Sequence, residues 1–211
     1  MVRSREAHAR DSYAATPPQL VAGTRCLDFL NTVEWRGRPG AQEERLTSYG
    51  EFIHWAAAAG LLDRRDARRL RAIMREHPAA AASVLREAIA AREALAILLG
   101  DAAGSGHALR LLRAVLDRSR YALALAREGK AIRARWKPAG PVLRRPLLEL
   151  LREAIALLES PKHARIRSCA NDECGWYYLD SSRNQSRRWC RMQSCGNQAK
   201  ARAHYRRQRS G

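Results

Sequence analysis

The chain has 211 residues and a mass of 23.7 kDa, which suits one compact domain or a larger domain with a small appendage. Its 39 Lys and Arg against 21 Asp and Glu give a formal net charge of +18, and its 46% hydrophobic residues suffice for a buried core, which excludes a disordered basic tail. No apolar run reaches the ~18 residues of a membrane span, and the first twenty residues lack the apolar stretch of a signal peptide. We therefore expect a cytoplasmic protein with no membrane partner.

Residues 1–17 lack periodicity and are expected to form a mobile N-terminal lead-in. The apolar segment 26–33 is expected to begin a helix or to end a strand, and Gly and Pro in 34–42 indicate a loop. Helical spacing of apolar residues then predicts five helices. Their ranges are about 46–60, 63–77, 80–99, 105–128 and 144–159.

A period of two replaces the helical spacing over 132–136, where Ile132, Ala134 and Trp136 alternate with arginines. This alternation predicts a short strand, and so a short β hairpin is an option within the helical part. Pro161 closes the last of the five helices and marks the predicted domain boundary. We expect a mostly α fold: a helical domain over 18–161 and a small C-terminal module over 162–211.

Positive charge concentrates in that module. Residues 162–211 hold twelve Lys and Arg against three acids, a balance of +9, and the other 161 residues share another +9. Because 35 of the 39 basic residues are Arg and Ala is also abundant, coding bias accounts for part of the total, and location is the more informative signal. The concentration indicates a polyanionic partner, most simply nucleic acid.

Four of the five cysteines fall in the same module, with the spacing C-x4-C-x15-C-x4-C: Cys169, Cys174, Cys190 and Cys195. Two short-spaced cysteine pairs can wrap two chain segments around one ion and close a tetrahedral thiolate site, which suits Zn²⁺. An iron–sulfur cluster and redox disulfides are the alternatives. Gly175 permits a tight turn after the first pair, a strand is expected to lead away from it, and a helix is expected to begin near Cys195. The fifth cysteine, Cys26, is expected to be a small buried residue.

The motifs of the module resemble a known family. Cys-x4-Cys-Gly-Trp from Cys169, Leu-Asp-x-Ser-Arg-Asn from Leu179, and Arg-Arg-Trp-Cys-x-Met-x-x-Cys-Gly-Asn from Arg187 are similar to the CGNR zinc finger. The segment Cys26–Thr32, Cys-Leu-Asp-Phe-Leu-Asn-Thr, is similar to the opening motif of the ABATE domain, the usual partner of that finger.

The resemblance implies one structural zinc held by the four cysteines and a role as a stress-induced or ligand-responsive transcription regulator. It also exposes one departure. The arginine of the family's Cys-Gly-Asn-Arg motif is Gln198 in this chain, which removes a positive charge at that position.

On a helix that starts at Cys195, Lys200, His204 and Arg207 share one face, and Arg202, Arg206 and Arg209 share another, nearer the metal. We expect phosphate contacts from these side chains and base contacts from side-chain amides. The candidate nucleic-acid-binding residues are Arg183, Arg187, Arg188, Arg191, Asn197, Gln198, Lys200, Arg202, His204, Arg206 and Arg207.

In the N-terminal domain, Asp28 and Asn31 are polar residues in an apolar segment and, with Trp55, are candidates for a small-molecule pocket. The alternative is that Asp28 caps and Asn31 hydrogen-bonds the backbone. No catalytic constellation stands out, and we do not expect an enzyme. The sequence therefore favours a DNA-binding transcription regulator with a helical sensor or dimerisation domain, responding to a small-molecule effector or acting as a homodimer. The alternatives are an RNA-binding protein and a zinc-stabilised module for a protein partner.

Overall fold

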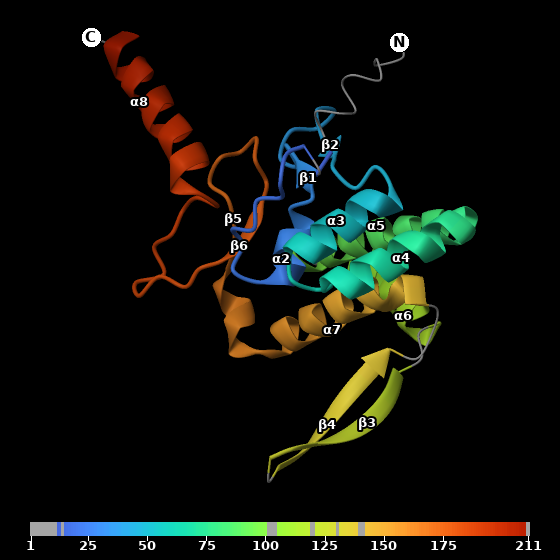
Figure 1. The fold of residues 1–211 in the computed structure, drawn as a ribbon. Helices are drawn as coiled ribbons and strands as arrows, with labels where there is room; N and C mark the ends of the chain where they lie inside the picture. Colours follow the sequence, from blue (N-terminus) through green and yellow to red (C-terminus); the bar gives the residue numbers. More distant parts are fainter. Residues whose placement is uncertain are drawn as a thin grey trace. The chain divides into compact units, whose positions relative to one another are not determined.

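The structure is a computed structural model that describes residues 12–13, 15–100, 105–118, 121–129, 131–138 and 142–209 (Figure 1). The chain forms two compact units. The central unit comprises Ser48–Arg152, and the terminal unit combines Met1–Thr47 with Glu153–Gly211. Among the described residues, no helix combines the length and the apolar character that crossing a membrane requires.

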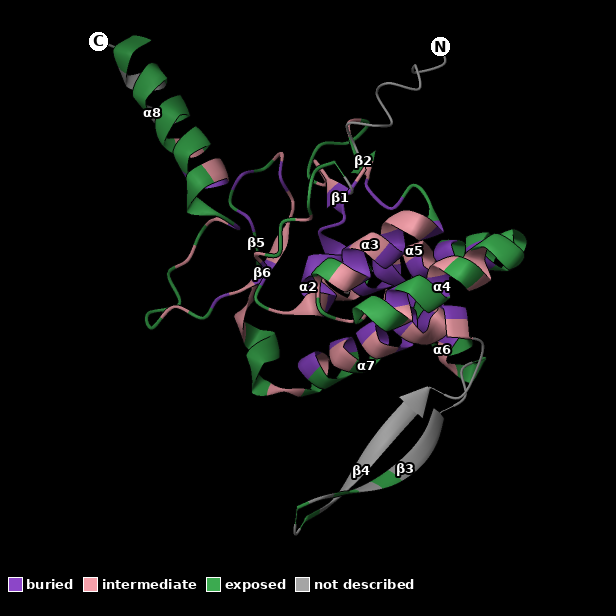
Figure 2. Cartoon of the chain, viewed as in Figure 1, coloured by how far each residue is buried: buried purple, intermediate pink, exposed green. Residues whose placement is uncertain are grey.

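The central unit is built from helices with buried apolar faces. Its main helices are α3 (Tyr49–Ala58), α4 (Arg64–Glu76), α5 (Pro78–Gly100), α6 (Ser105–Asp117) and the first part of α7 (Arg145–Glu159), which the short 3₁₀ helix η2 (Val142–Arg144) precedes. Phe52, Ile53, Leu70 and Leu147 are almost completely buried (Figure 2). These helices confirm the predicted mostly α fold, with bounds close to those expected from the sequence except in one place.

Side-chain caps fix where two of these helices begin. The Ser48 hydroxyl accepts a hydrogen bond from the Glu51 N–H at 3.2 Å, and the Asp63 carboxylate accepts one from the Asp66 N–H at 2.7 Å. Each cap satisfies a backbone donor that has no partner within its own helix. The helix predicted over 63–77 therefore begins at the Asp63 cap.

The predicted fourth helix, 105–128, is wrong in its second half. Helix α6 ends at Asp117, and Tyr121–Glu128 forms strand β3 instead, paired antiparallel with β4 (Ala131–Pro138). In 121–126 large and small residues alternate, a period of two that its leucines and alanines disguise as a helical sequence. Gly129 has a φ of +60°, a backbone conformation that favours glycine, and it lies at the turn of the hairpin. The option of a short hairpin is confirmed.

The terminal unit contains short elements from both ends of the chain. From the N-terminal side come helix α2 (Arg25–Leu30) and the paired strands β1 (Val33–Glu34) and β2 (Glu43–Glu44). From the C-terminal side come η3 (Pro161–Arg165), the antiparallel strands β5 (Ile166–Ser168) and β6 (Tyr177–Leu179), the π turn η4 (Met192–Gly196) and helix α8 (Asn197–Arg209). The segment 26–33 thus both completes a helix and begins a strand, and Cys26 is buried in α2 as expected.

Hydrogen bonds join the two halves of the terminal unit. The Asn31 side chain pairs with the backbone of Tyr177, donating from Nδ2 to the carbonyl and accepting from the N–H at Oδ1, both at 2.8 Å. The Leu179 N–H donates to the Ala22 carbonyl at 2.8 Å, and Trp176 Nε1 donates to the Val33 carbonyl at 3.0 Å. The N-terminal segment therefore packs along β6 as part of the same fold.

Two glycines mark a close contact between these halves. A Cβ at Gly37 would lie 1.9 Å from the carbonyl oxygen of Asp172, and a Cβ at Gly175 would lie 2.5 Å from the Gly37 nitrogen. Backbone therefore lies directly on backbone, which only glycine permits. The predicted boundary at residue 161 stays a prediction, whereas the compact units of the fold divide after residues 47 and 152.

Of the predicted lead-in 1–17, residues 1–11 and 14 lie outside the described part of the chain. Tyr13, which is described, is 9% exposed, and the guanidinium of Arg45 lies 5.1 Å from the centre of its ring. Burial raises the pKa of the Tyr13 hydroxyl above its usual range. This end of the lead-in therefore packs against the terminal unit.

Candidate metal centre and nucleic-acid interface

The four C-terminal cysteines come together in one buried cluster. All four are less than 9% exposed, and their sulfur atoms lie within 4.8 Å of one another. Cys190 Sγ lies 3.7 Å from Cys174 Sγ and 3.6 Å from Cys195 Sγ. Cys169 and Cys174 flank the turn that joins β5 to β6, here called the knuckle (169–174), and Cys195 lies in η4 at the start of α8.

These sulfur positions fit zinc. Tetrahedral Zn²⁺ with Zn–S bonds of about 2.3 Å separates its sulfur ligands by roughly 3.8 Å, close to the two distances above. Four thiolates complete the tetrahedron and leave no open position, the pattern of a structural site. The chain thus holds one structural zinc site, and the predicted cofactor is confirmed.

Backbone hydrogen bonds hold the ligands in place. The Cys169 N–H donates to the Trp176 carbonyl and the Cys174 N–H to the Asn171 carbonyl, each at 2.8 Å, which closes the knuckle. Cys169 Sγ accepts from the Cys190 N–H at 3.4 Å, and Cys195 Sγ accepts from Asn171 Nδ2 at 3.6 Å. Donors aimed at sulfur stabilise the thiolate form that binds metal.

The shared environment divides the thiols by acidity. Hydrogen bonds from Cys174 and Cys190 lower the pKa of the Cys169 thiol, whereas their interactions with Cys169 raise the pKa values of Cys174 and Cys190. Because zinc binds the thiolate form, metal binding releases the remaining thiol protons, and zinc affinity falls as the pH falls.

A second buried polar group orders the loop between the two cysteine pairs. Asp180, which is fully buried, accepts hydrogen bonds at Oδ1 from the Ser182 hydroxyl at 2.6 Å and the Ser182 N–H at 2.9 Å, and at Oδ2 from the Arg187 N–H at 3.1 Å. These donors lower the pKa of the carboxyl. Asp180 belongs to the Leu-Asp-x-Ser-Arg-Asn motif of the sequence, but that motif does not reveal that its carboxylate orders the loop.

Arg187, a candidate for nucleic-acid contact, has its guanidinium engaged within the protein. Nε donates to the Trp189 carbonyl and Nη2 to the Val21 carbonyl, each at 3.0 Å, and Nη2 also donates to the Cys190 carbonyl. The guanidinium lies 4.3 Å from the centre of the Tyr178 ring. Arg187 therefore connects the N-terminal segment, at Val21, to the loop between the two cysteine pairs (175–189), here called the cysteine loop.

The other candidates differ in how they are held. Arg183, Arg188 and Arg191 are exposed, with Arg191 Nη1 donating to Gln19 Oε1 at 3.2 Å. Arg202 lies beside the knuckle, as expected for the face nearer the metal: it pairs with Glu173 at 3.1 Å and donates to Asn171 Oδ1 at 3.4 Å. Lys200 and His204 are exposed on α8.

The remaining four candidates also belong to α8. Asn197 donates to the Gln193 carbonyl at 3.2 Å, and Gln198 Oε1 accepts from Asn171 Nδ2 at 3.3 Å. Arg206 and Arg207 are part of the helix, and their side chains lie outside the described ones. The two amides that the sequence suggested as base-reading groups therefore both have partners within the finger.

The three pocket candidates lie in different units. Asp28 Oδ1 accepts from the N–H groups of Val21 and Ala22 at 2.8 and 2.9 Å, and Asn31 pairs with Tyr177 as described above. Burial raises the pKa of Asp28 from 3.8 to about 6, against the lowering by these hydrogen bonds and by Arg187. Trp55 belongs to the central unit and is stacked on Phe52, with ring centres 6.3 Å apart. Asp28 and Asn31 thus have the partners of the structural alternative, and the effector pocket stays a prediction.

Two protein-family models match the chain. Residues 165–208 match the CGNR zinc finger, and residues 23–161 match ABATE, described as "Putative stress-induced transcription regulator". No curated protein matches. The finger match contains the four clustered sulfurs, and the ABATE match contains α2, Asn31 and the central unit. The chain therefore belongs to the ABATE family and carries a CGNR zinc finger at its C-terminal end.

Proposed function

We propose that the protein is a DNA-binding transcription regulator, and not an enzyme, in which the zinc site holds helix α8 for contact with duplex DNA. The family description supports the regulatory part of this proposal. The DNA-binding part rests on the character of α8 itself.

The observation that carries the proposal is a helix with basic and polar side chains exposed all round. Every described side chain of α8 is exposed except Ala199, which is half-buried (Figure 2). The helix carries five Lys and Arg, one His and no acid in Asn197–Arg209. A helix with no apolar face gains little free energy from packing on its own domain. Its basic and polar composition is therefore better explained by contact with a binding partner. A row of cations without acids suits a phosphate backbone.

The zinc site gives this helix a fixed starting point. Cys195 is a zinc ligand immediately before α8, and Arg202 connects the middle of the helix to Glu173 in the knuckle. The first two turns of α8 are therefore braced, and the remainder extends from the finger. We assign Arg202 to this bracing and Lys200 and His204 to contact with the nucleic acid.

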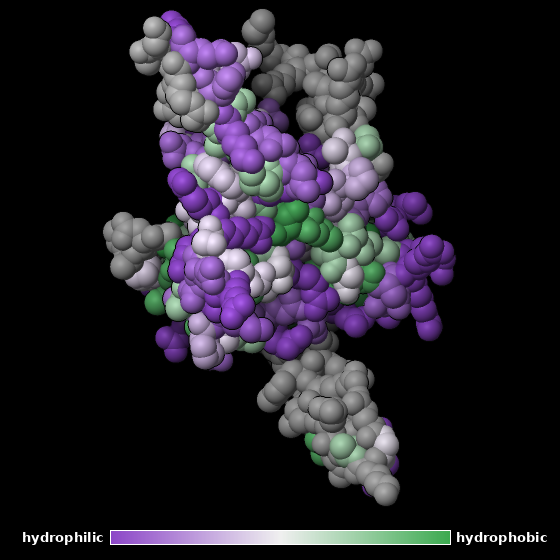
Figure 3. Space-filling view, turned by 90° about the vertical axis from the view of Figure 1, so that its left-hand side faces the viewer, coloured by the Kyte–Doolittle hydropathy of each residue, from purple (hydrophilic) through white to green (hydrophobic). Residues whose placement is uncertain are grey.

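A basic groove next to the cysteine loop adds to the proposed interface. It has a volume of about 680 Å³ and is lined by Arg188, Trp189, Arg191 and neighbouring residues. The guanidinium of Arg188 lies 5.4 Å from the centre of the Trp189 ring. Among the coloured side chains in Figure 3 hydrophilic ones predominate, and hydrophobic ones gather across the middle of the face. Arg188 and Arg191 could neutralise phosphates that follow those bound by α8.

The test is the salt dependence of binding to duplex DNA by the zinc-loaded full chain. About four to six phosphate contacts predict that log K falls with log salt at a slope of about −3.6 to −5.4. Lys200→Ala is expected to flatten the slope by about 0.9, the contribution of one contact. Lys162→Ala removes an exposed lysine outside α8 and serves as the matched control, with an unchanged slope.

The same titration with RNA hairpins separates the classes of nucleic acid. Binding to DNA without salt dependence, or equal effects of the two lysine substitutions, would overturn the role of α8. A consistent preference for RNA would replace DNA by RNA as the partner. No binding to either at low salt would leave a protein partner as the explanation of the charge.

A further inference from the structure

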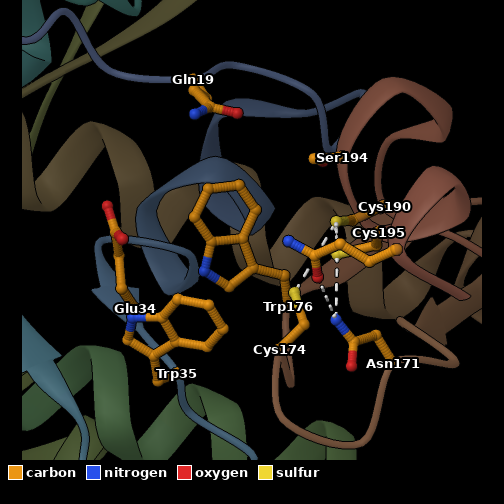
Figure 4. Close-up of a pocket in the computed structure, with 10 residues that line it drawn as sticks. Gln19, Glu34, Trp35, Asn171, Cys174, Trp176, Cys190, Ser194 and Cys195 are labelled. Atoms are coloured by element: carbon orange, nitrogen blue, oxygen red, sulfur yellow. Dashed lines mark hydrogen bonds between the residues drawn. The ribbon is translucent and has the colours of Figure 1, made fainter. Parts of the chain in front are cut away.

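A cavity beside the zinc site has no role in the function proposed above. Its volume is about 180 Å³, and it lies entirely within the terminal unit. Three of the zinc-binding cysteines line it together with Gln19, Glu34, Trp35, Asn171, Trp176 and Gln198 (Figure 4). We propose that this cavity binds a small planar heteroaromatic molecule of about the size of a nucleobase.

Two indole rings provide its apolar walls. In Figure 4 the rings of Trp35 and Trp176 lie on the side away from the cysteine sulfurs. The hydrogen bond from Trp176 Nε1 to the Val33 carbonyl, at 3.0 Å, fixes one ring. Indole faces bind flat rings by stacking, and a ring fixed in advance loses little entropy when a ligand binds.

The backbone at Trp35 adds a second sign of a prepared site. Its φ is +53°, in the left-handed region that bulky residues rarely adopt. The Arg38 N–H donates to the Trp35 carbonyl at 2.8 Å, which closes the turn around it. Such conformations cost energy and persist where the surrounding structure enforces them, often at ligand sites. Here the strained turn places an indole at a cavity.

Polar groups around the walls specify the chemistry of the ligand. Glu34 supplies a carboxylate acceptor, 3.6 Å from Arg45 Nη1. The oxygens of Gln19 and Gln198 accept hydrogen bonds from Arg191 and Asn171, so each amide offers its NH₂ group as the remaining donor. A ring with both donor and acceptor edges, such as an amino-substituted nitrogen heterocycle, matches this set.

The volume of the cavity and the charge of its lining restrict the class of ligand further. An engineered apolar cavity of roughly 150 Å³ holds one benzene molecule, so 180 Å³ suits one ring system. A nucleotide is larger than one ring system, and its phosphate carries the same sign of charge as the Glu34 carboxylate in the lining, which disfavours it. The zinc site has no open position, so the ring would bind by stacking and hydrogen bonds rather than by coordination.

The position of Gln198 gives binding a structural consequence. Gln198 lies in the first turn of α8, and Asn171 connects it to the zinc ligand Cys195. A ring in the cavity would contact the base of that helix. The binding proposal itself does not depend on DNA and is tested without it.

In the experiment the zinc-loaded full chain is titrated with adenine, guanine, cytosine, uracil and adenosine 5′-monophosphate. Calorimetry and tryptophan fluorescence measure the binding. We expect at least one free base to bind with a submillimolar Kd and to quench fluorescence, and the nucleotide to bind about tenfold more weakly or worse. Glu34→Gln is expected to weaken base binding about tenfold, because a charge-assisted hydrogen bond is lost. Glu43→Gln is the matched control: Glu43 faces Glu34 in the β1–β2 register but does not line the cavity.

Substitutions of Trp35, which forms one wall of the cavity, test the proposal independently of Glu34. Trp35→Phe retains a flat ring and Trp35→Ala removes it, at equal backbone strain, so binding should survive the first change and be lost in the second. Zinc content and circular dichroism verify that both variants are folded. Failure of every free base to bind at millimolar concentration, equal effects of Glu34→Gln and Glu43→Gln, or unchanged binding by a folded Trp35→Ala protein would each overturn the proposal.

Discussion

The central and terminal units achieve their stability in different ways. The central unit buries large apolar side chains such as Phe52, Trp55 and Leu147 between helices. The terminal unit has short elements and relies on a metal site, buried polar side chains and direct backbone contacts, among them Asp180, Asn31 and Gly37. Hydrophobic burial is spread over many atoms, whereas a zinc site and a buried hydrogen bond concentrate free energy at single positions.

The comparison indicates where the protein is sensitive to change. Apolar packing tolerates moderate substitution because neighbouring side chains adjust. No neighbouring group can take over the role of a thiolate ligand, of a buried carboxylate or of a glycine in contact with another backbone. We therefore expect even a small substitution in the terminal unit, such as one added methyl group, to be destabilising, whereas a comparable effect in the central unit requires the loss of a large buried side chain.

The largest effect is expected for Cys190→Ser. Loss of one thiolate removes a zinc ligand, and zinc content should fall from about one per chain to near zero. Because α2 and β1 share hydrogen bonds with the finger, amide exchange should increase in residues 18–47 as well as in 165–198, whereas α3–α5 should keep their protection.

Phe52→Ala provides the reverse experiment. Phe52 is fully buried in the central unit, and its truncation should cost about 3–5 kcal/mol of unfolding free energy while zinc content stays near one per chain.

One outcome of the Cys190→Ser experiment would contradict the comparison of the two units. If residues 18–47 keep their protection from amide exchange in the zinc-free Cys190→Ser protein, the N-terminal segment is stable without the finger.

The next effect is expected for Gly37→Ala. The new methyl group would meet the Asp172 carbonyl at 1.9 Å, so the loop must move away from the knuckle at a cost of about 2–4 kcal/mol. Gly50→Ala, inside α3 with only a side-chain atom at 3.4 Å, is the control and should change stability by less than about 1 kcal/mol. Chemical denaturation of the two zinc-loaded proteins measures the difference, and similar midpoints would argue against close backbone packing.

A pH-dependent effect is expected for Asp28→Asn. Burial raises the pKa of Asp28 in the folded protein to about 6, so the fold favours the protonated form. Stability should therefore fall as the pH rises from about 4 to about 6, and the ionised carboxylate should cost about 2–3 kcal/mol above pH 6. Asn keeps an oxygen for the Val21 and Ala22 N–H groups without the charge. The difference in unfolding free energy between variant and wild type should thus grow over this interval and level off at neutral pH; a constant difference would contradict the raised pKa.

The smallest effect is expected for Asn31→Ala. It removes both hydrogen bonds to the Tyr177 backbone and leaves buried groups without partners, at a cost of about 1–2 kcal/mol. Asn184→Ala, at an exposed position of the finger, should have almost no effect. Unchanged stability of Asn31→Ala together with lost response to a bound molecule would favour the ligand role suggested by the sequence.

Local patterns made much of the fold predictable. Cysteine spacing identified the zinc ligands, because metal coordination requires a fixed number of thiolates at short separations. Apolar periodicity identified the helices of the central unit, and Asp63 identified a helix start. In each case the determining residues lie within about one helical turn or one metal-binding turn of one another.

Long-range contacts made the rest inaccessible. Asn31 and Tyr177 are 146 residues apart, and nothing in either local sequence indicates the other. The basic segment around Arg187 favours a phosphate contact, yet the guanidinium donates to four carbonyl groups of the protein. The sequence predicts a helix over 121–128 because leucine and alanine favour helices, but the pairing with 131–138 overrides that preference.

The insertion of the central unit between the two halves of the terminal unit also sets an order of synthesis. Residues up to Thr47 leave the ribosome first, but the knuckle and cysteine loop with which they pack follow about 120 residues later. At roughly 5–20 residues per second, the N-terminal segment waits on the order of ten seconds for its partner. The central unit is complete during that time, so nascent chains pass through a stage with folded helices and an open terminal unit. The metal is captured last, and a chain that stops before Cys190 never closes that unit.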